Sequence, residues 1–229
     1  MNQVRVITGN IFTTGCQTLV NTVNCAGVMG AGLALECRLR HPDMHTRYVR
    51  LCEQGALEVG KLWLYRAEPR SILNFPTKKH WRQPSHPSYL HLGLQNFMRT
   101  YQRRGILSIA FPLLGTQHGG LDQDAALSLM LGYLQDCEIP VEVYRHDPAA
   151  PDDLYGRFKA LMASATDDQV RAATRLRSPQ LRALRDALAS PRVHQLNQLA
   201  AWRGVGDRTL EAAFRLTESA SLPGQPGLL

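Results

Sequence analysis

The first part of the chain alternates short apolar runs with longer amphipathic stretches. A short run that is apolar throughout predicts a strand buried on both faces, whereas a 3.6-residue period predicts a helix with one buried face. Strands that alternate with helices predict an α/β sandwich around a mostly parallel or mixed sheet. Strands are expected at residues 4–8, 19–24, 62–66, 71–75, 106–111 and 141–144, and helices at residues 31–40, 41–55, 87–102 and 122–136.

The pattern changes at the sequence DPAAP, where proline and small residues interrupt it. Beyond it the chain is rich in Ala, Leu and Arg and has no strand pattern, with helices expected at residues 152–163, 167–176, 179–189, 193–202 and 207–217. We therefore predict a first domain of residues 1–147, a linker at residues 148–151 and a helical domain of residues 152–229. The tail SLPGQPGLL is expected to be loose.

Composition limits the classes of protein to consider. The 229 residues carry a formal charge of +7, which favours phosphate-rich partners such as nucleic acid, although a basic surface can also serve solubility alone. The five cysteines are odd in number and form no CxxC pair, which argues against a disulfide framework and against a zinc site. No apolar run reaches the ~20 residues that span a bilayer. We expect a soluble, cytoplasmic protein without a membrane or metal partner.

Two glycine-rich segments each follow a predicted strand. The first, LVNTVNCAGVMGAG (residues 19–32), runs from a strand into a helix, and the second is PLLGTQHGGL (residues 112–121). Glycines let a backbone approach a diphosphate, a helix N-terminus attracts anions, and amides in a glycine turn form an anion-binding nest. Ligands of α/β sheets bind beyond the carboxyl ends of the strands, where both segments belong. They predict a nucleotide-diphosphate site, with plain tight turns as the alternative.

A third segment, NFPTKKHWR (residues 74–82), carries reactive and charged groups. The preceding apolar strand would deliver Lys78 to the end of the sheet, and nearby cations and apolar groups lower the pKa of a lysine and make it nucleophilic. Trp81 can stack on a base or belong to the core, and the cations can hold phosphates or form a solvated turn. Asp122, directly after the second glycine-rich segment, can line the site, cap the next helix, or do both.

These residues resemble a known family. The TGNIF end of the first strand, the VNTVN…GVMGAG segment and the LLGTQHGG segment are similar to the ADP-ribose pocket of macrodomains. The FPTK-x-HWR string resembles one branch of that family, which contains the DNA ADP-ribosyl glycohydrolase antitoxins of DarT–DarG systems and the terminal ADP-ribose glycohydrolase. The resemblance covers about residues 1–147. It implies a macrodomain three-layer α/β/α sandwich with a mixed sheet, followed here by a small all-α domain.

The resemblance also implies an activity. The protein would be a hydrolase that cleaves the N-glycosidic bond between ADP-ribose and a nucleobase of DNA, thymidine in the best-known systems, without a cofactor. Lys78 would act at the distal ribose C1 carbon and Asp122 would assist. The implied partners are ADP-ribose, ADP-ribosylated single-stranded DNA and a cognate ADP-ribosyltransferase toxin.

Matching the family pattern residue by residue gives the expected binding groups. Near adenine and along the diphosphate and distal ribose these are Gly9, Asn10, Ile11, Asn21, Asn24, Gly27, Val28, Met29, Gly30, Leu114, Gly115, Thr116, Gln117, His118, Gly119, Gly120 and Leu121. Nucleic acid would contact Lys79, His80, Trp81 and Arg82. Asn10 stands where many macrodomains have aspartate, so an amide would replace a carboxylate opposite the adenine amine.

Two other functions are compatible with the sequence. The first is a non-catalytic ADP-ribose sensor in which Lys78 only supports the pocket. The second is a regulator that uses the C-terminal helices to bind DNA or to hold a toxin, because residues 198–210 have the spacing of a helix-turn-helix. The combination of Lys78 with Asp122 favours the enzyme.

Overall fold

The chain forms two compact units. The computed structural model describes residues 4–219 and divides the chain into Met1–His146 and Asp147–Leu229. The tail of residues 221–229, which we expected to be loose, lies outside the described residues.

A six-stranded sheet forms the centre of the first unit, with the strand order β1-β6-β5-β2-β4-β3. Only the β3–β4 pair is antiparallel, so the sheet is mixed, as predicted. The strands are β1 (Arg5–Gly9), β2 (Thr18–Asn24), β3 (Trp63–Tyr65), β4 (Ser71–Lys78), β5 (Ile109–Pro112) and β6 (Val141–His146).

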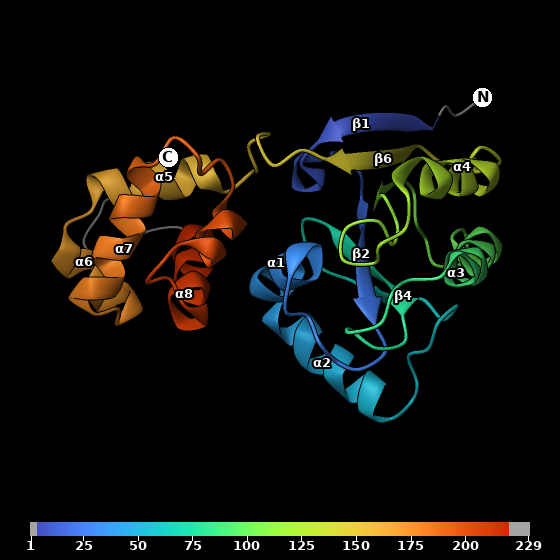
Figure 1. The fold of residues 1–229 in the computed structure, drawn as a ribbon, viewed down its shortest axis with the longest axis horizontal. Helices are drawn as coiled ribbons and strands as arrows, with labels where there is room; N and C mark the ends of the chain where they lie inside the picture. The colour runs from blue at the N-terminus through green and yellow to red at the C-terminus, as the bar shows by residue number, and fades with distance from the viewer. Residues whose placement is uncertain (1–3, 220–229) are drawn as a thin grey trace. The chain divides into compact units, whose positions relative to one another are not determined.

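Helices cover both faces of this sheet (Figure 1). α1 (Gly32–Arg40) and α2 (Pro42–Glu53) lie on one face, and α3 (Pro87–Thr100) and α4 (Gln123–Leu134) lie on the other. Successive residues of a strand point to opposite faces, so Leu19 packs in the cluster under α1 and α2 while Val20 packs in the cluster under α3 and α4. This two-sided burial explains why the strands are apolar throughout, and it confirms the predicted α/β/α sandwich.

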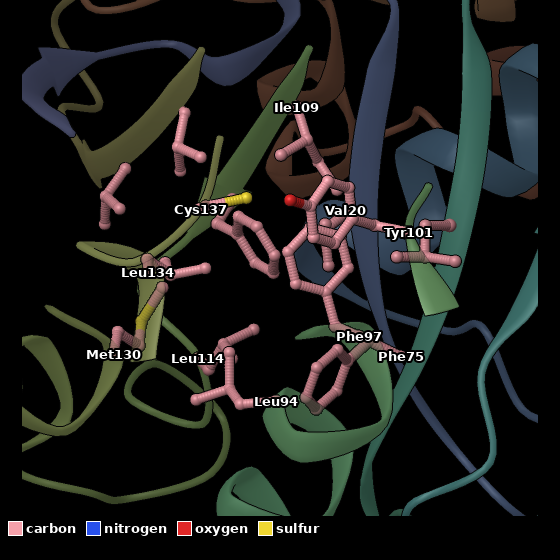
Figure 2. Close-up of a cluster of buried hydrophobic side chains, with 14 of the residues drawn as sticks. Val20, Phe75, Leu94, Phe97, Tyr101, Ile109, Leu114, Met130, Leu134 and Cys137 are labelled. Carbon is pink, nitrogen blue, oxygen red and sulfur yellow. The ribbon is translucent and has the colours of Figure 1, made fainter. Parts of the chain in front are cut away.

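The larger core lies between the sheet and the α3–α4 layer (Figure 2). The Phe97 ring meets the Phe111 ring edge-on at 5.2 Å and stacks on Tyr101 at 5.3 Å. A Cβ atom at Gly93 would lie 2.1 Å from Cζ of Phe75, so only glycine lets α3 come this close to β4.

Strand β4 differs from the prediction in a way that matters for the site. It continues past Phe75 through Pro76 to Lys78, so Lys78 is the last residue of a strand. The antiparallel partner β3 pairs with β4 only as far as Asn74, which leaves one edge of β4 open beyond that residue. An open edge tolerates a proline, because the missing N–H has no partner to lose. A short 3₁₀ helix, η1 (Ile11–Thr13), was not predicted.

The second unit is all-α, as predicted. It contains α5 (Tyr155–Ser164), α6 (Asp167–Thr174), α7 (Ser178–Ala189), the 3₁₀ helix η2 (Leu196–Ala201) and α8 (Asp207–Glu218). The side chains of Phe158 and Phe214 are fully buried in its core. No helix within residues 4–219 has the length and apolar character needed to cross a membrane.

The predicted linker at residues 148–151 is held by the second unit. The Gln195 side-chain amide donates to the carbonyls of Asp147 and Ala150 at 2.8 and 2.7 Å, and the Gln198 amide donates to the carbonyl of Pro148 at 2.7 Å. These bonds give most of the segment fixed partners, so it does not act as a free spacer. Composition alone does not reveal side chains that bind a segment from almost fifty residues away.

The helix-turn-helix spacing of residues 198–210 does not produce two α-helices. Its first half is the six-residue 3₁₀ helix η2, and more than half of α8 is buried. A recognition helix needs a free face to enter the major groove. The exposed residues of α8 mix acids with bases and are Asp207, Arg208, Glu211, Arg215 and Glu218.

Candidate functional site

Three segments leave the carboxyl ends of three adjacent strands. The first glycine loop (residues 25–31) follows β2, the basic segment (residues 78–82) begins at the end of β4, and the second glycine loop (residues 113–121) follows β5. Because β5, β2 and β4 are neighbours and run parallel, all three segments emerge at one edge of the sheet. The sheet topology therefore brings these three segments together, whereas the predicted residues Gly9, Asn10 and Ile11 lie at the end of the edge strand β1.

Asn24 shapes the first glycine loop from within. Its side-chain nitrogen donates to the Val28 carbonyl at 2.6 Å, and its side-chain oxygen accepts from the Ala26 amide at 2.9 Å. The Tyr48 hydroxyl, on α2, donates to the Asn24 backbone carbonyl at 2.7 Å. Both polar atoms of the side chain thus help to fold the loop, and contact of this amide with the distal ribose stays a prediction.

The loop leads into a helix whose N-terminus has no side-chain cap. Ala31 occupies the cap position of α1, and no side chain among the described residues accepts from the first-turn amides. An uncapped helix N-terminus carries N–H groups and a positive partial charge, which suit a phosphate. Anion binding at the first glycine loop stays a prediction, and the uncapped start of α1 is compatible with it.

The second glycine loop is a closed turn. The Leu121 amide donates to the Gly115 carbonyl at 3.0 Å, and Gly115 and Gly120 adopt positive φ angles of 71° and 75°. A Cβ atom at Gly119 would lie 2.1 Å from the Gly115 carbonyl oxygen, so no side chain fits there. In the part of the chain that the structure describes, the amides of residues 116–120 form no backbone hydrogen bond of good geometry. Successive backbone amides in a turn of this kind can form an anion-binding nest.

Lys78 connects the strands to the second glycine loop. Its Cα pairs with that of Asn24 across the β2–β4 ladder, and its Nζ donates a hydrogen bond to the backbone carbonyl of His118. The Cys25 amide donates to the Lys79 carbonyl at 3.1 Å, which ties the first glycine loop to the basic segment. Lys78 therefore lies where the three segments meet.

The two glycine loops also approach each other directly. A Cβ atom at Gly32, the first residue of α1, would lie 3.2 Å from the imidazole of His118. Gly32 has a positive φ of 55°, and glycine adopts this conformation without the penalty that a side chain imposes. The start of α1 and the tip of the second glycine loop are therefore in near contact.

Burial changes the acid–base character of Lys78. The half-buried side chain has a pKa below its ordinary value of 10.5, because desolvation disfavours the charged ammonium. The sequence predicted that neighbouring cations would contribute to this shift, but burial is its only cause. A lower pKa increases the fraction of neutral, nucleophilic amine near neutral pH.

Asp122 caps the helix that follows the second glycine loop. Its Oδ1 accepts from the amides of Asp124 and Ala125 at 3.1 and 2.9 Å. Both bonds use the same oxygen, and the side chain is exposed. The capping role that the sequence left open is therefore present, and Oδ2 remains available for chemistry.

The outer part of the basic segment is an aromatic–cationic stack. The His80 and Trp81 rings stack with centroids 5.6 Å apart, and the Arg82 guanidinium lies 4.3 Å from the centre of the Trp81 ring. The Trp81 side chain is 44% exposed, so the alternative that it belongs to the core is wrong. An exposed aromatic ring beside an arginine can stack on a base of single-stranded nucleic acid.

Several side chains predicted to bind the ligand are buried. Asn21 is 0% exposed, and its nitrogen donates to the Asn74 side chain at 2.9 Å, so it joins β2 to β4 rather than meeting a ligand. Asn10 caps η1 by accepting from the Phe12 amide. Buried side chains also include Ile11, Met29 and Leu114, which leaves only their backbones for binding. The sequence reasoning missed Tyr48 and Ser85, which contact the two glycine loops and lie outside any motif.

Comparison with known proteins identifies the fold. The Macro domain family model matches residues 20–130. The DNA ADP-ribosyl glycohydrolase of Thermus aquaticus is 40% identical over 149 residues, which cover 63% of this chain but only 41% of that protein's length.

Solved structures agree with this match. The macrodomain of Mycobacterium tuberculosis DarG superposes with a TM-score of 0.61 at 36% identity, covering 63% of this chain and 98% of that one. Thermosipho africanus DarTG in complex with ADP-ribose superposes with a TM-score of 0.59 at 34% identity, covering 64% of this chain and 43% of that one. The chain therefore belongs to the macrodomain family, and its first unit is similar to the macrodomains of DarG proteins.

Proposed function

We propose that this protein is an ADP-ribosyl glycohydrolase that removes ADP-ribose from a nucleobase of DNA, with thymidine as the modified base. The observation that carries the proposal is the position of Lys78, whose half-buried amine reaches the second glycine loop from the end of β4. The lowered pKa of this amine suits a nucleophile. Similarity to the Thermus aquaticus DNA ADP-ribosyl glycohydrolase supports this activity and substrate.

The site fits an elongated nucleoside diphosphate. The end of β1, where we expect adenine, and the end of β4, where Lys78 lies, are four strand spacings apart, or about 19 Å. Between them lie the free amides of the second glycine loop and the uncapped start of α1, which can share the two phosphates. Adenine at one end and the distal ribose at the other would place the ribose C1 carbon next to Lys78.

The chemistry then follows from two side chains. The neutral Lys78 amine attacks C1 of the distal ribose, a C–N bond to lysine forms, and the bond from C1 to the base nitrogen breaks. The departing base takes the electron pair of that bond, and Asp122 relays to it the proton that the attacking amine loses; water then releases ADP-ribose and restores the amine. In the alternative mechanism, water attacks C1 and Lys78 acts as an electrostatic anchor instead of a nucleophile.

Substrate class is tested by product release. Purified protein is incubated with single-stranded oligonucleotides that carry ADP-ribose on T or on G, and separately with an ADP-ribosylated protein. We expect free ADP-ribose from the DNA substrates rather than from the protein, because a nucleic-acid contact adds to the ADP-ribose pocket that both substrates share. Thymidine as the modified base predicts faster release from T than from G. Chromatography of the released nucleotide provides the measurement. Release from the modified protein alone would contradict the proposed substrate.

The nucleic-acid contact of the basic segment gives a separate prediction. Trp81→Ala should raise the KM for a modified oligonucleotide by about 5- to 100-fold, the cost of losing one stacked base. The affinity for free ADP-ribose should stay unchanged, since the exposed Trp81 side chain is not among the residues expected to bind ADP-ribose. Steady-state kinetics and calorimetry measure the two quantities. Trp81→Phe keeps an aromatic face and serves as the control, and an unchanged KM in Trp81→Ala would remove Trp81 from the DNA contact.

The partners of the whole protein are part of the same proposal. ADP-ribose on DNA must be attached by a transferase, so a toxin with that activity is the expected partner. A similar Thermosipho africanus protein is a fusion of a DNA ADP-ribosyl transferase with a DNA ADP-ribosyl glycohydrolase. We assign the role of holding the toxin or DNA to the second unit. We expect the protein to act in the cytoplasm. This chain spans 41% of the Thermus aquaticus relative, so these assignments do not come from that match.

A second candidate function is a non-catalytic ADP-ribose sensor. One observation favours it, namely that the Lys78 amine is already bonded to the His118 carbonyl and so supports the wall of the site. The two functions differ in turnover. A sensor would bind ADP-ribose and leave every modified oligonucleotide intact.

A further inference from the structure

Ser85 contacts the second glycine loop from a segment outside the predicted site. It lies between the basic segment and α3, and its backbone amide donates to the Gly119 carbonyl at 3.0 Å. Its sequence neighbours Pro84 and His86 are exposed, whereas Ser85 itself is only 4% exposed. The residue is therefore drawn under the glycine loop rather than lying at the surface with its neighbours.

Two consecutive backbone carbonyls of the second glycine loop thus accept hydrogen bonds from residues of the neighbouring segment 78–85. Lys78 binds the carbonyl of His118, and Ser85 binds the carbonyl of Gly119. In a planar trans peptide the C=O and the following N–H point in opposite directions. Fixing these two carbonyls therefore directs the amides of Gly119 and Gly120 away from Lys78 and Ser85. Neither amide forms a backbone hydrogen bond of good geometry among residues 4–219.

The Ser85 side chain fills the interior of the turn. Its Oγ would lie 2.4 Å from a Cβ atom at Gly119 and 3.3 Å from one at Gly115, so it occupies the space those side chains would take. This buried hydroxyl has no hydrogen-bond partner within the described residues. A side chain larger than serine at position 85 would push directly on the backbone of the turn.

We propose that Ser85 is a positioning residue, which together with Lys78 holds the second glycine loop so that the amides of Gly119 and Gly120 face the diphosphate. The inference rests on the proposed ADP-ribose site and names the residue that sets its anion-binding geometry. Ser85 does not touch the ligand. It acts through the peptide units between His118 and Gly120.

The test compares Ser85→Val with Ser85→Ala. Valine forces a branched side chain against Gly119, and the resulting loss of one or two amide contacts to phosphate should weaken ADP-ribose binding about 10- to 100-fold. Alanine keeps the backbone N–H and does not crowd Gly119, so the affinity of Ser85→Ala for ADP-ribose should stay within about threefold of wild type. Ser88→Val makes the same chemical change on the exposed first turn of α3 and should bind ADP-ribose like wild type.

Two readouts separate positioning from a general loss of structure. Adenosine lacks the diphosphate, so its NMR-detected binding should be unchanged in Ser85→Val. In wild type, ADP-ribose should shift the amide resonances of Gly119 and Gly120, and in Ser85→Val it should not. Where valine prevents folding, Ser85→Thr adds one methyl group and gives the same comparison.

Definite results would overturn the inference. The inference is overturned if a folded Ser85→Val protein has an affinity for ADP-ribose within threefold of wild type. It is also overturned if that variant loses adenosine binding and ADP-ribose binding to the same extent. Binding is measured by calorimetry and needs no turnover. A wild-type protein that binds ADP-ribose but releases none from DNA would therefore refute the proposed enzyme while leaving the role of Ser85 open to the same test.

Discussion

Lys78→Ala should lower the release of ADP-ribose from modified DNA by about 1,000-fold or more, as expected when a nucleophile or its equivalent is removed. Affinity for free ADP-ribose should fall by less than about tenfold, because the variant loses the bond to the His118 carbonyl but the Ser85 amide still holds the Gly119 carbonyl. Single-turnover release from an oligonucleotide and calorimetry with ADP-ribose measure the two effects. Loss of binding with persistent turnover would contradict the assignment.

Two lysine variants distinguish the possible roles of this amine. Lys79→Ala removes the neighbouring, exposed cation and should have a much smaller effect on release. Lys78→Arg keeps a cation that can donate to His118 but stays protonated at every accessible pH. Activity in Lys78→Arg would identify an electrostatic anchor, whereas inactivity with retained ADP-ribose binding would identify a nucleophile.

The pH profile provides a further check on Lys78. Burial lowers its pKa below 10.5, so the neutral amine becomes populated at lower pH than in an exposed lysine. If the neutral form reacts, the single-turnover rate should rise with pH and level off below pH 10.5. A rate that falls over the same range would assign the function to the protonated form.

Gly119→Ala should weaken ADP-ribose binding about 100-fold or more, because it distorts a turn whose amides are expected to hold the diphosphate. The added Cβ would lie 2.1 Å from the Gly115 carbonyl oxygen and 2.4 Å from the Ser85 Oγ. The first neighbour is backbone, so the turn itself must move. Calorimetry gives the affinity, and release from modified DNA should fall with it.

A glycine in the same unit provides the matched control. Gly132 lies within α4, and a Cβ atom there would meet nothing within 4 Å. Gly132→Ala should therefore bind ADP-ribose like wild type and unfold at an equal or slightly higher temperature, since alanine favours helix. Equal affinity in Gly119→Ala and Gly132→Ala would show that the second glycine loop does not hold the ligand.

The pattern of apolar, polar and glycine positions along the sequence was sufficient to predict the layers of the α/β/α sandwich and the segments that carry reactive groups. Buried strands such as β2 are apolar throughout because helices cover both faces, and amphipathic runs such as α3 show which side they bury. Glycines mark the two loops because only glycine allows their backbone conformations and close contacts. Each of these signals comes from residues near one another in the sequence, which explains why they could be recognised without coordinates.

The partners of the polar groups were decided by tertiary structure. The sequence did not reveal that the Asn24 side chain bonds within the loop that follows it, or that the buried Asn21 side chain binds Asn74 on the neighbouring strand. Ser85 carried no signal, because its role depends on a carbonyl more than thirty residues away. The sequence by itself determined which elements form and where a lysine and glycines could gather. Only the folded chain decided which polar atoms are buried, bonded or free, because burial and hydrogen bonding depend on residues that are distant in sequence and adjacent in space.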